Sequence, residues 1–290
     1  MRIPSNKIAD VVRFFRDELK YYYPKEEVET FIAYCFEEFA GLRRADIFLN
    51  SNDTVTESEL LKFNFAIKDL KQNKPIQYIL GKADFYGLKF LVSKHVLIPR
   101  PETEELVDLI IKATGTSPPI SILDIGTGSG CIPIALKKNL QSTNLYALDI
   151  SFEALEVAKQ NAIMNNVHID FFQHDILSAG SQLPDQDIKF NIIVSNPPYI
   201  CISEKEQMQK NVLDYEPHIA LFVSDNDPLL FYKMIADFAL KHLKQNGKLY
   251  FEINRAFGLE TKLMLENKGF KNVLLIKDLN NNNRILQGNI

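Results

Sequence analysis

The fold of this chain is decided by residues 120–130, which read ISILDIGTGSG. The run from Ile120 to Ile125 has the apolar content of a strand that is buried on both faces. Glycines at positions 126, 128 and 130 then lead into the helical run 131–139. Glycine is needed where φ is positive or where a ligand lies against the main chain. The stretch therefore predicts a parallel strand, a ligand-binding loop and a helix.

A second predicted strand, residues 144–150, places Asp149 at its carboxyl end. A carboxylate at that position can accept hydrogen bonds from the ribose hydroxyls of a nucleoside. The loop reads G-x-G-x-G after Asp124, which differs from the dinucleotide pattern G-x-G-x-x-G, and it lacks the P-loop lysine. Together with Asp149, it resembles the S-adenosylmethionine loop of the Rossmann-like methyltransferases.

The tetrapeptide Asn196-Pro197-Pro198-Tyr199 follows the apolar run 190–195. The Asn196 side chain offers a carbonyl acceptor, and the prolines have no N–H, so neighbouring carbonyls can stay free to bind a substrate. Tyr199 offers a flat face for stacking. We interpret the tetrapeptide as a clamp for a flat group that carries an NH2, either a carboxamide or a nucleobase amine; the alternative is an ordinary turn.

Composition excludes several classes of protein. The chain has 290 residues and a net charge of −4, without the basic bias typical of nucleic-acid-binding proteins, so we expect no direct nucleic-acid partner. It has no apolar run of the roughly 18 residues that a membrane span needs. Residues 1–10 lack the apolar core of a secretory signal, so we predict a cytoplasmic protein. Its three scattered cysteines and five histidines show no metal-ligand spacing, and we expect neither a metal nor a disulfide.

Three regions differ in pattern. Helical periodicity covers 6–22, 25–40 and 56–72, which predicts an all-α domain over residues 1–75. Short β-like pieces at 77–81 and 83–90 predict a β-hairpin linker over residues 76–98. Strands and helices alternate after that, so residues 99–290 are predicted to form an α/β domain with a parallel sheet covered on both faces.

At this point four motifs together closely resemble the bacterial release-factor glutamine methyltransferases, the PrmC/HemK family. They are YILG with FYG at 78–87, VLIPRPETE at 96–104, LDIGTGSGCI at 123–132 and SNPPYI at 195–200. The resemblance implies a Rossmann-like, seven-stranded class I S-adenosylmethionine methyltransferase domain with an antiparallel last hairpin, preceded by a small helical substrate-docking domain. It also implies methylation of the side-chain amide nitrogen of the glutamine in the Gly-Gly-Gln loop of class 1 peptide chain release factors. We expect a monomer.

The resemblance also implies roles for individual residues. The cofactor S-adenosylmethionine is expected to bind Gly126, Thr127, Gly128, Ser129, Gly130, Asp149, Asp175, Ile176 and Asn196. The substrate is expected to contact Asn196, Pro197, Pro198 and Tyr199, of which Asn196, Pro197 and Tyr199 are the catalytic candidates. Arg100, Glu102 and Glu104 match a family motif near the mouth of the pocket, although helix capping and interdomain pairing explain them equally well.

The chain departs from the family pattern at residues 224–229 and at Asn254, where glycine is common. Two other functions stay open. One is an adenine-amine methyltransferase acting on DNA or RNA, since the same tetrapeptide handles a base amine. The other is a noncatalytic adenosylmethionine-binding scaffold.

Overall fold

The computed structural model of the chain describes residues 3, 5–115, 119–178 and 187–290. It divides into two compact units: residues 1–81 with 209–215, and residues 82–208 with 216–290. The domain boundaries drawn from the sequence at 75/76 and 98/99 stay predictions. The segment 1–10, used above to predict localisation, includes residues 1, 2 and 4, which lie outside the described residues. In the described part of the chain, no helix combines the length and apolar character needed to cross a bilayer.

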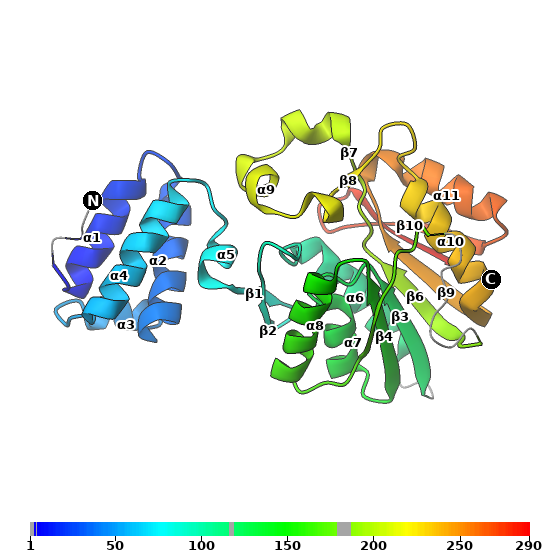
Figure 1. Cartoon of the computed structure of the whole chain (residues 1–290), viewed down its shortest axis with the longest axis horizontal. Coiled ribbons are helices and arrows are strands. Elements are labelled where there is room, and N and C mark those ends of the chain that lie inside the picture. Colours follow the sequence, from blue (N-terminus) through cyan, green and yellow to red (C-terminus); the bar gives the residue numbers. More distant parts are fainter. Residues whose placement is uncertain (1–2, 4, 116–118, 179–186) are drawn as a thin grey trace. The chain divides into compact units, whose positions relative to one another are not determined.

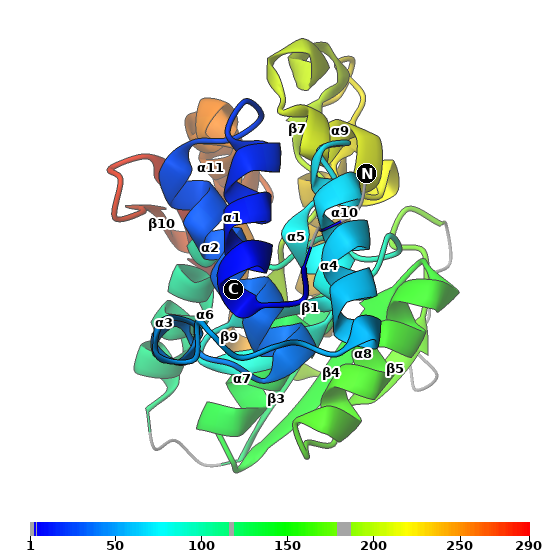
Figure 2. The ribbon, with the colours of Figure 1, turned by 90° about the vertical axis from the view of Figure 1, so that its left-hand side faces the viewer.

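The first unit is helical. Its elements are α1 (Ile8–Leu19), α2 (Lys25–Ala40), α3 (Arg44–Leu49), α4 (Glu57–Leu70), α5 (Ile76–Leu80) and the short α9 (Lys210–Tyr215). Helices α1, α2 and α4 run alongside one another (Figure 2) and enclose a core that includes Phe15, Phe36 and Phe63. Thr56 and Glu59 form a capping box that starts α4, each side chain accepting from the other residue's backbone N–H. The three predicted helices are confirmed, whereas α3 was not predicted.

Helix α5 corrects the prediction of a β-like piece at 77–81. Pro75 precedes the helix, and Gly81 ends it in the left-handed conformation with φ 70°. Ile76, Ile79 and Leu80 pack on the helical core at i, i+3 and i+4, which is a helical spacing. The β-branched and aromatic content of this segment suggested a strand, but its apolar periodicity is that of a helix.

The second unit contains a seven-stranded sheet in the order β10-β11-β9-β6-β3-β4-β5. Figure 1 labels β10, β9, β6, β3 and β4 of this sheet. The strands are β3 (Ile120–Ile125), β4 (Thr143–Asp149), β5 (Asp170–Gln173), β6 (Phe190–Ser195), β9 (Leu243–Glu252), β10 (Lys271–Lys277) and β11 (Asn283–Asn289). Strands β5, β4, β3, β6 and β9 pair in parallel, whereas β11 pairs antiparallel with both β9 and β10. The predicted sheet with its antiparallel last hairpin is confirmed.

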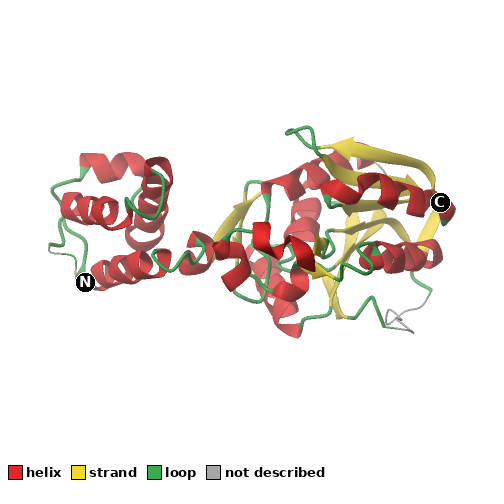
Figure 3. Cartoon of the chain, turned by 90° about the horizontal axis from the view of Figure 1, so that it is seen from above, coloured by secondary structure: helices red, strands yellow, loops and turns green. Residues whose placement is uncertain are grey.

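Helices cover both faces of this sheet (Figure 3). They are α6 (Pro101–Thr114), α7 (Cys131–Asn139) and α8 (Phe152–Met164) on one face, and α10 (Leu230–His242) and α11 (Gly258–Asn267) on the other. In β3, Ile122 packs in the core under α6 and α7, while the next residue, Leu123, packs in the core under α10. Because successive side chains of a strand point to opposite faces, burial on both sides explains the continuous apolar runs in the sequence.

Smaller elements complete this unit. Strands β1 (Lys82–Phe85) and β2 (Leu88–Leu91) form an antiparallel hairpin, and β7 (Ile200–Cys201) pairs in parallel with β8 (Phe222–Val223). Strand β9 pairs with β6 from Leu243 onward, and the pairing shifts register between Phe190 and Ile192.

Candidate active site

A pocket of about 230 Å³ lies in the second unit, where the carboxyl ends of β3, β4 and β6 meet. Parallel α/β sheets bind their ligands at this edge. Ten of the twelve predicted site residues line the pocket: Gly126, Thr127, Gly128, Ser129, Asp149, Asp175, Ile176, Asn196, Pro197 and Pro198. Gly130 and Tyr199 are not among the lining residues. Segments that are distant in the sequence therefore meet in one cavity, while the roles predicted for these residues stay predictions.

The glycine loop is held against the neighbouring strand by its own main chain. The backbone N–H groups of Gly126 and Thr127 both donate to the Leu148 carbonyl, at 2.8 and 3.0 Å. Gly128 has a positive φ of 54°, and a Cβ there would meet no atom within 4 Å, because the residue borders the open pocket. Gly130 has φ 78°, but a Cβ there would lie 3.1 Å from the Ala158 Cβ. The first glycine leaves room for a ligand, and the second lets α7 approach α8.

Asp149 fastens the loop and faces the pocket at the end of β4. Its Oδ2 accepts from the Gly128 N–H at 2.8 Å, and its Oδ1 accepts from the Ser151 N–H at 2.9 Å. Burial raises the pKa of this carboxyl group, while the backbone donors act in the opposite direction. Each carboxylate oxygen has a second acceptor site, so Asp149 can still bind a pair of ligand hydroxyls.

One polar atom on the pocket wall, His174 Nε2, is buried without a partner among the described residues. Buried polar atoms are usually hydrogen-bonded, so such an atom favours a site that receives a polar ligand. Burial lowers the pKa of His174, which keeps its ring neutral. Asp175 is adjacent, and its Oδ1 accepts from the Leu177 N–H at 2.8 Å, which fixes the loop that follows β5.

The reacting edge of the pocket is formed by Asn196, Pro197 and Pro198, which follow β6. The Asn196 Nδ2 donates to Thr103 Oγ1 at 3.3 Å. This contact assigns the nitrogen of the side-chain amide to Thr103 and leaves the oxygen for another partner. Thr103 lies in the first turn of α6, is 2% exposed and also lines the pocket.

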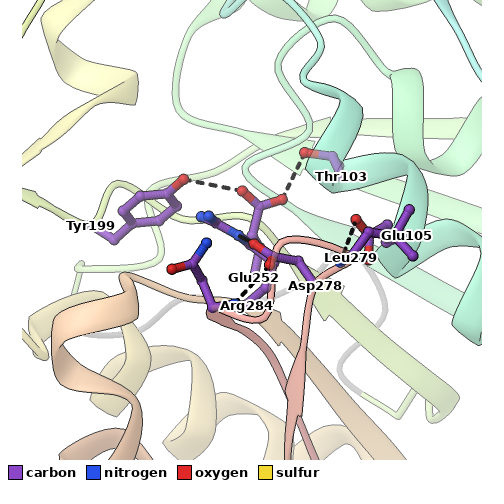
Figure 4. Close-up of polar contacts among 8 residues, drawn as sticks. Thr103, Glu105, Tyr199, Glu252, Asp278, Leu279 and Arg284 are labelled. Atoms are coloured by element: carbon purple, nitrogen blue, oxygen red, sulfur yellow. Dashed lines mark hydrogen bonds and ion pairs between the residues drawn. The ribbon is translucent and has the colours of Figure 1, made fainter.

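The Tyr199 side chain is held by Glu252, which is not among the residues that line the pocket. Its hydroxyl donates to Glu252 Oε1 at 3.1 Å, while Thr103 Oγ1 donates to Glu252 Oε2 at 2.6 Å, as Figure 4 shows. The Tyr199 ring packs on the core under α10. Burial raises the pKa of Glu252, and the two hydroxyl donors oppose that rise. The expected stacking of Tyr199 on a substrate stays a prediction; the contact that the structure shows is to Glu252.

The motif at 96–104 has a structural role at the pocket mouth. Arg100 pairs with Glu216 at 2.6 Å, and Glu216 also accepts from the Ile98 N–H at 3.2 Å. Glu104 accepts from the Tyr86 N–H at 2.7 Å and so connects α6 to the β1–β2 hairpin. These contacts lie within the second unit, and Arg100 at the N-cap of α6 makes no side-chain cap hydrogen bond, so they are neither the helix cap nor the interdomain pair that the sequence suggested. Arg100 also borders the pocket.

Two buried groups near the loop have shifted pKa values. Burial raises the pKa of Asp124 to about 7, and the hydroxyl of Thr127 opposes that rise. Burial likewise raises the pKa of the Cys131 thiol to about 12, so this pocket-lining cysteine is protonated and a poor nucleophile at neutral pH. Within the described ranges, no cluster of His, Cys, Asp or Glu is suited to a metal ion.

Sequence reasoning missed the roles of Thr103, Glu252 and Asn254. Thr103 lies in the motif at 96–104, and Glu252 lies two residues before Asn254, which the sequence analysis noted only as a departure from the family pattern. The Asn254 side chain donates to the Tyr199 carbonyl at 3.0 Å and to Glu204 at 3.1 Å, so the departure from glycine adds a tie to the tetrapeptide. Asp225, in the other departure, accepts from the Ser203 N–H and hydroxyl, at 3.1 and 2.7 Å.

Comparison with known proteins matches both parts of the chain. The Methyltransferase small domain family matches residues 105–215, and the PrmC N-terminal domain family matches residues 10–81. A release factor glutamine methyltransferase from Flavobacterium psychrophilum is 47% identical over 270 residues, covering 92% of this chain and 93% of its own. A release factor glutamine methyltransferase from Bacteroides thetaiotaomicron is 42% identical over 279 residues, covering 96% and 99%.

Solved structures agree on the fold. A methyltransferase from Pyrococcus furiosus matches with a TM-score of 0.50 and 18% identity, covering 77% of this chain and 96% of its own. The second unit, with its seven-stranded and mostly parallel sheet, therefore has the class I methyltransferase fold.

Proposed function

The chain belongs to the family of release factor glutamine methyltransferases, and from this premise we propose that it methylates class 1 peptide chain release factors. The methyl group comes from S-adenosylmethionine, and the acceptor is the side-chain amide nitrogen of the glutamine in the Gly-Gly-Gln loop. One observation carries the proposal: a single pocket joins the glycine loop and Asp149 to the Asn196-Pro197-Pro198 edge.

The residues of the pocket fit S-adenosylmethionine. Asp149 offers acceptors for the ribose hydroxyls, and Gly128 leaves free space beside the main chain. His174 Nε2 has no partner in the described part of the chain and suits a polar ligand, while Ile176 and Ile132 supply apolar surface for the adenine. The bound cofactor would supply an electrophilic methyl carbon on its sulfonium.

The Asn196-Pro197 edge would hold the acceptor amide. The Asn196 Oδ1 and the Pro197 carbonyl would each accept one N–H of the glutamine side chain, which directs the π face of its nitrogen toward the methyl group. An amide nitrogen is a poor nucleophile because its lone pair is delocalised. Positioning is therefore the main contribution of the protein, and such positioning is worth up to about 7–11 kcal/mol.

The transfer needs no dedicated base. The glutamine nitrogen forms the new C–N bond as the sulfonium–carbon bond breaks, and the electron pair of that bond stays on sulfur. The methylated nitrogen is then strongly acidic and gives one proton to water. This scheme agrees with the neutral state that burial imposes on the Cys131 thiol, whose pKa is about 12.

Neither alternative is favoured. An adenine-amine methyltransferase usually carries a basic recognition surface, whereas this chain has a net charge of −4. A noncatalytic scaffold has no need of Asn196 at the pocket edge. We also propose that the enzyme acts as a monomer without a nucleic-acid partner, and we expect it in the cytoplasm.

The test is to incubate the purified protein with S-adenosylmethionine and a bacterial class 1 release factor, then to map the product by peptide mass spectrometry. One added methyl group on the Gly-Gly-Gln glutamine, and none on a Gln→Ala factor, supports the proposal. Methylation of adenine in DNA or RNA without methylation of the factor would refute it, and so would cofactor binding without any transfer.

A further inference from the structure

A series of hydrogen bonds connects the edge of the pocket to the core of the second unit. The Asn196 Nδ2 donates to Thr103 Oγ1 at 3.3 Å, and Thr103 Oγ1 donates to Glu252 Oε2 at 2.6 Å. The other oxygen of Glu252 accepts from the Tyr199 hydroxyl at 3.1 Å. Figure 4 shows Glu252 between Thr103 and Tyr199, with Arg284 beside it. Both ends of the tetrapeptide are therefore tied to one carboxyl group.

The chemistry of the Glu252 carboxylate decides which group donates and which accepts in each of these hydrogen bonds. An ionised carboxylate only accepts, so the Thr103 hydroxyl hydrogen must point to Glu252. The hydroxyl oxygen then has only lone pairs to offer to Asn196, and only the NH2 end of the Asn196 amide can use them. The Asn196 oxygen is left for the pocket.

Burial makes this arrangement rigid. Glu252 is 1% exposed and Thr103 is 2% exposed, so water does not compete for these hydrogen bonds. A buried carboxylate that lost a donor would leave an acceptor unpaired, which is costly. Burial raises the pKa of Glu252, while the hydroxyl donors of Thr103 and Tyr199 and the charge of Arg284 favour its ionised form. Rotation of the Asn196 amide by 180° would place its NH2 in the pocket and an oxygen against the Thr103 oxygen, where neither has a hydrogen to share.

We propose that Thr103 and Glu252 are positioning residues that hold the Asn196 amide with its oxygen toward the substrate. This inference rests on the proposed function and deepens it. The pair would select a substrate group that donates N–H, such as a carboxamide, over a carboxylate of the same shape. Selectivity for glutamine over glutamate would then come from a residue that need not itself bind the substrate.

The test compares Thr103→Val, which has nearly the same shape but no hydroxyl, with Thr103→Ser, which keeps the hydroxyl. Methylation is measured at saturating cofactor and release factor. We expect Thr103→Val to lower turnover by about tenfold, the effect of losing one hydrogen bond that orients a group, and Thr103→Ser to stay within about threefold of wild type. Cofactor affinity is expected to stay within about twofold in both variants, since no cofactor-binding group is removed.

A second readout separates orientation from mere structural support. A release factor carrying Gln→Glu in its Gly-Gly-Gln loop is tested as a competitive inhibitor. Once the Asn196 amide is free to rotate, its NH2 can donate to that carboxylate. We therefore expect the Gln→Glu factor to inhibit Thr103→Val several-fold more strongly than wild type, while the Gln factor binds more weakly.

Thr261→Val is the matched control, because it removes another buried threonine hydroxyl, one that donates to the Phe257 carbonyl away from the pocket. It should leave both readouts unchanged. Unchanged inhibition by the Gln→Glu factor in Thr103→Val would overturn the inference even if turnover falls, and so would equal changes in Thr261→Val. If Thr103→Val fails to fold by circular dichroism, Thr103→Ala, which also lacks the hydroxyl, is measured in the same way and must show the same reversal. Wild-type turnover on the Gln factor reports on the proposed function separately.

Discussion

Gly128 and Gly130 are two residues apart in one loop, and the structure predicts opposite consequences for replacing each with alanine. Both have positive φ, 54° and 78°, so alanine at either position costs about 1–2 kcal/mol in backbone strain. The surroundings of the added methyl group then differ. At Gly128 it meets no atom within 4 Å, whereas at Gly130 it lies 3.1 Å from the Ala158 Cβ and 3.2 Å from the Ile134 Cδ1.

The magnitudes follow from these contacts. Gly130→Ala adds overpacking between α7 and α8, which typically costs a further 1–3 kcal/mol, so we expect a total loss of about 2–5 kcal/mol in the free energy of unfolding. Gly128→Ala should lose only the strain, about 1–2 kcal/mol. Its methyl group stands in the pocket, however, and should weaken S-adenosylmethionine binding by about tenfold or more, because the cofactor must shift away from the main chain.

The assay combines urea unfolding with calorimetric titration of S-adenosylmethionine. Gly130→Ala should be the less stable variant, yet its folded fraction should bind the cofactor with near-wild-type affinity, since Gly130 does not line the pocket. The reasoning is refuted if Gly128→Ala binds as tightly as wild type, or if it loses more stability than Gly130→Ala.

Other expected outcomes concern single polar groups. Asp149→Ala should weaken the cofactor by roughly 10- to 100-fold, since hydrogen bonds to a charged group are lost, while Asp149→Asn should lose less; equal dissociation constants in titration calorimetry would contradict this. Asp124 has its pKa raised by burial from 3.8 to about 7. The folded state thus binds the extra proton, and its stability falls as pH rises from about 4 to 7. Asp124→Asn removes this loss, so its stability relative to wild type should increase by about 3 kcal/mol between pH 5 and 8.5 in urea unfolding; a difference that stays constant over this range would contradict the raised pKa of Asp124. Tyr199→Phe keeps the ring but removes a donor to Glu252, and should lower the free energy of unfolding by about 1–2 kcal/mol; wild-type stability with lost turnover would instead place the hydroxyl at the substrate.

The architecture could be predicted because its signals are local in the sequence. The run 120–125 is apolar throughout since both faces of β3 are buried, and the glycine loop adjoins it directly. The same reasoning failed at Ile76–Leu80, where residue types typical of strands form a helix that packs on its neighbours. Tertiary packing overrode local preference there.

The pocket was predictable as a set of strand ends, but its supporting contacts were not. Thr103 and Glu252 are separated by 149 positions, and Arg100 and Glu216 by 116. No periodicity in the sequence connects such pairs, because they meet only through the order of strands in the sheet. For the same reason the sequence suggested stacking for Tyr199 and could not reveal the partner of its hydroxyl.

The most direct test of the central claim is single-turnover methylation of a class 1 release factor by wild type, Asn196→Ala and the control Asn139→Ala, with cofactor affinity measured in parallel. The Asn139 side chain bonds within α7 to the Ala135 carbonyl, away from the pocket. The account predicts that Asn196→Ala lowers the rate by about 100-fold or more with cofactor affinity within about threefold, and that Asn139→Ala leaves both nearly unchanged. A wild-type rate in Asn196→Ala, or a loss of cofactor affinity that accounts for the whole defect, would contradict it.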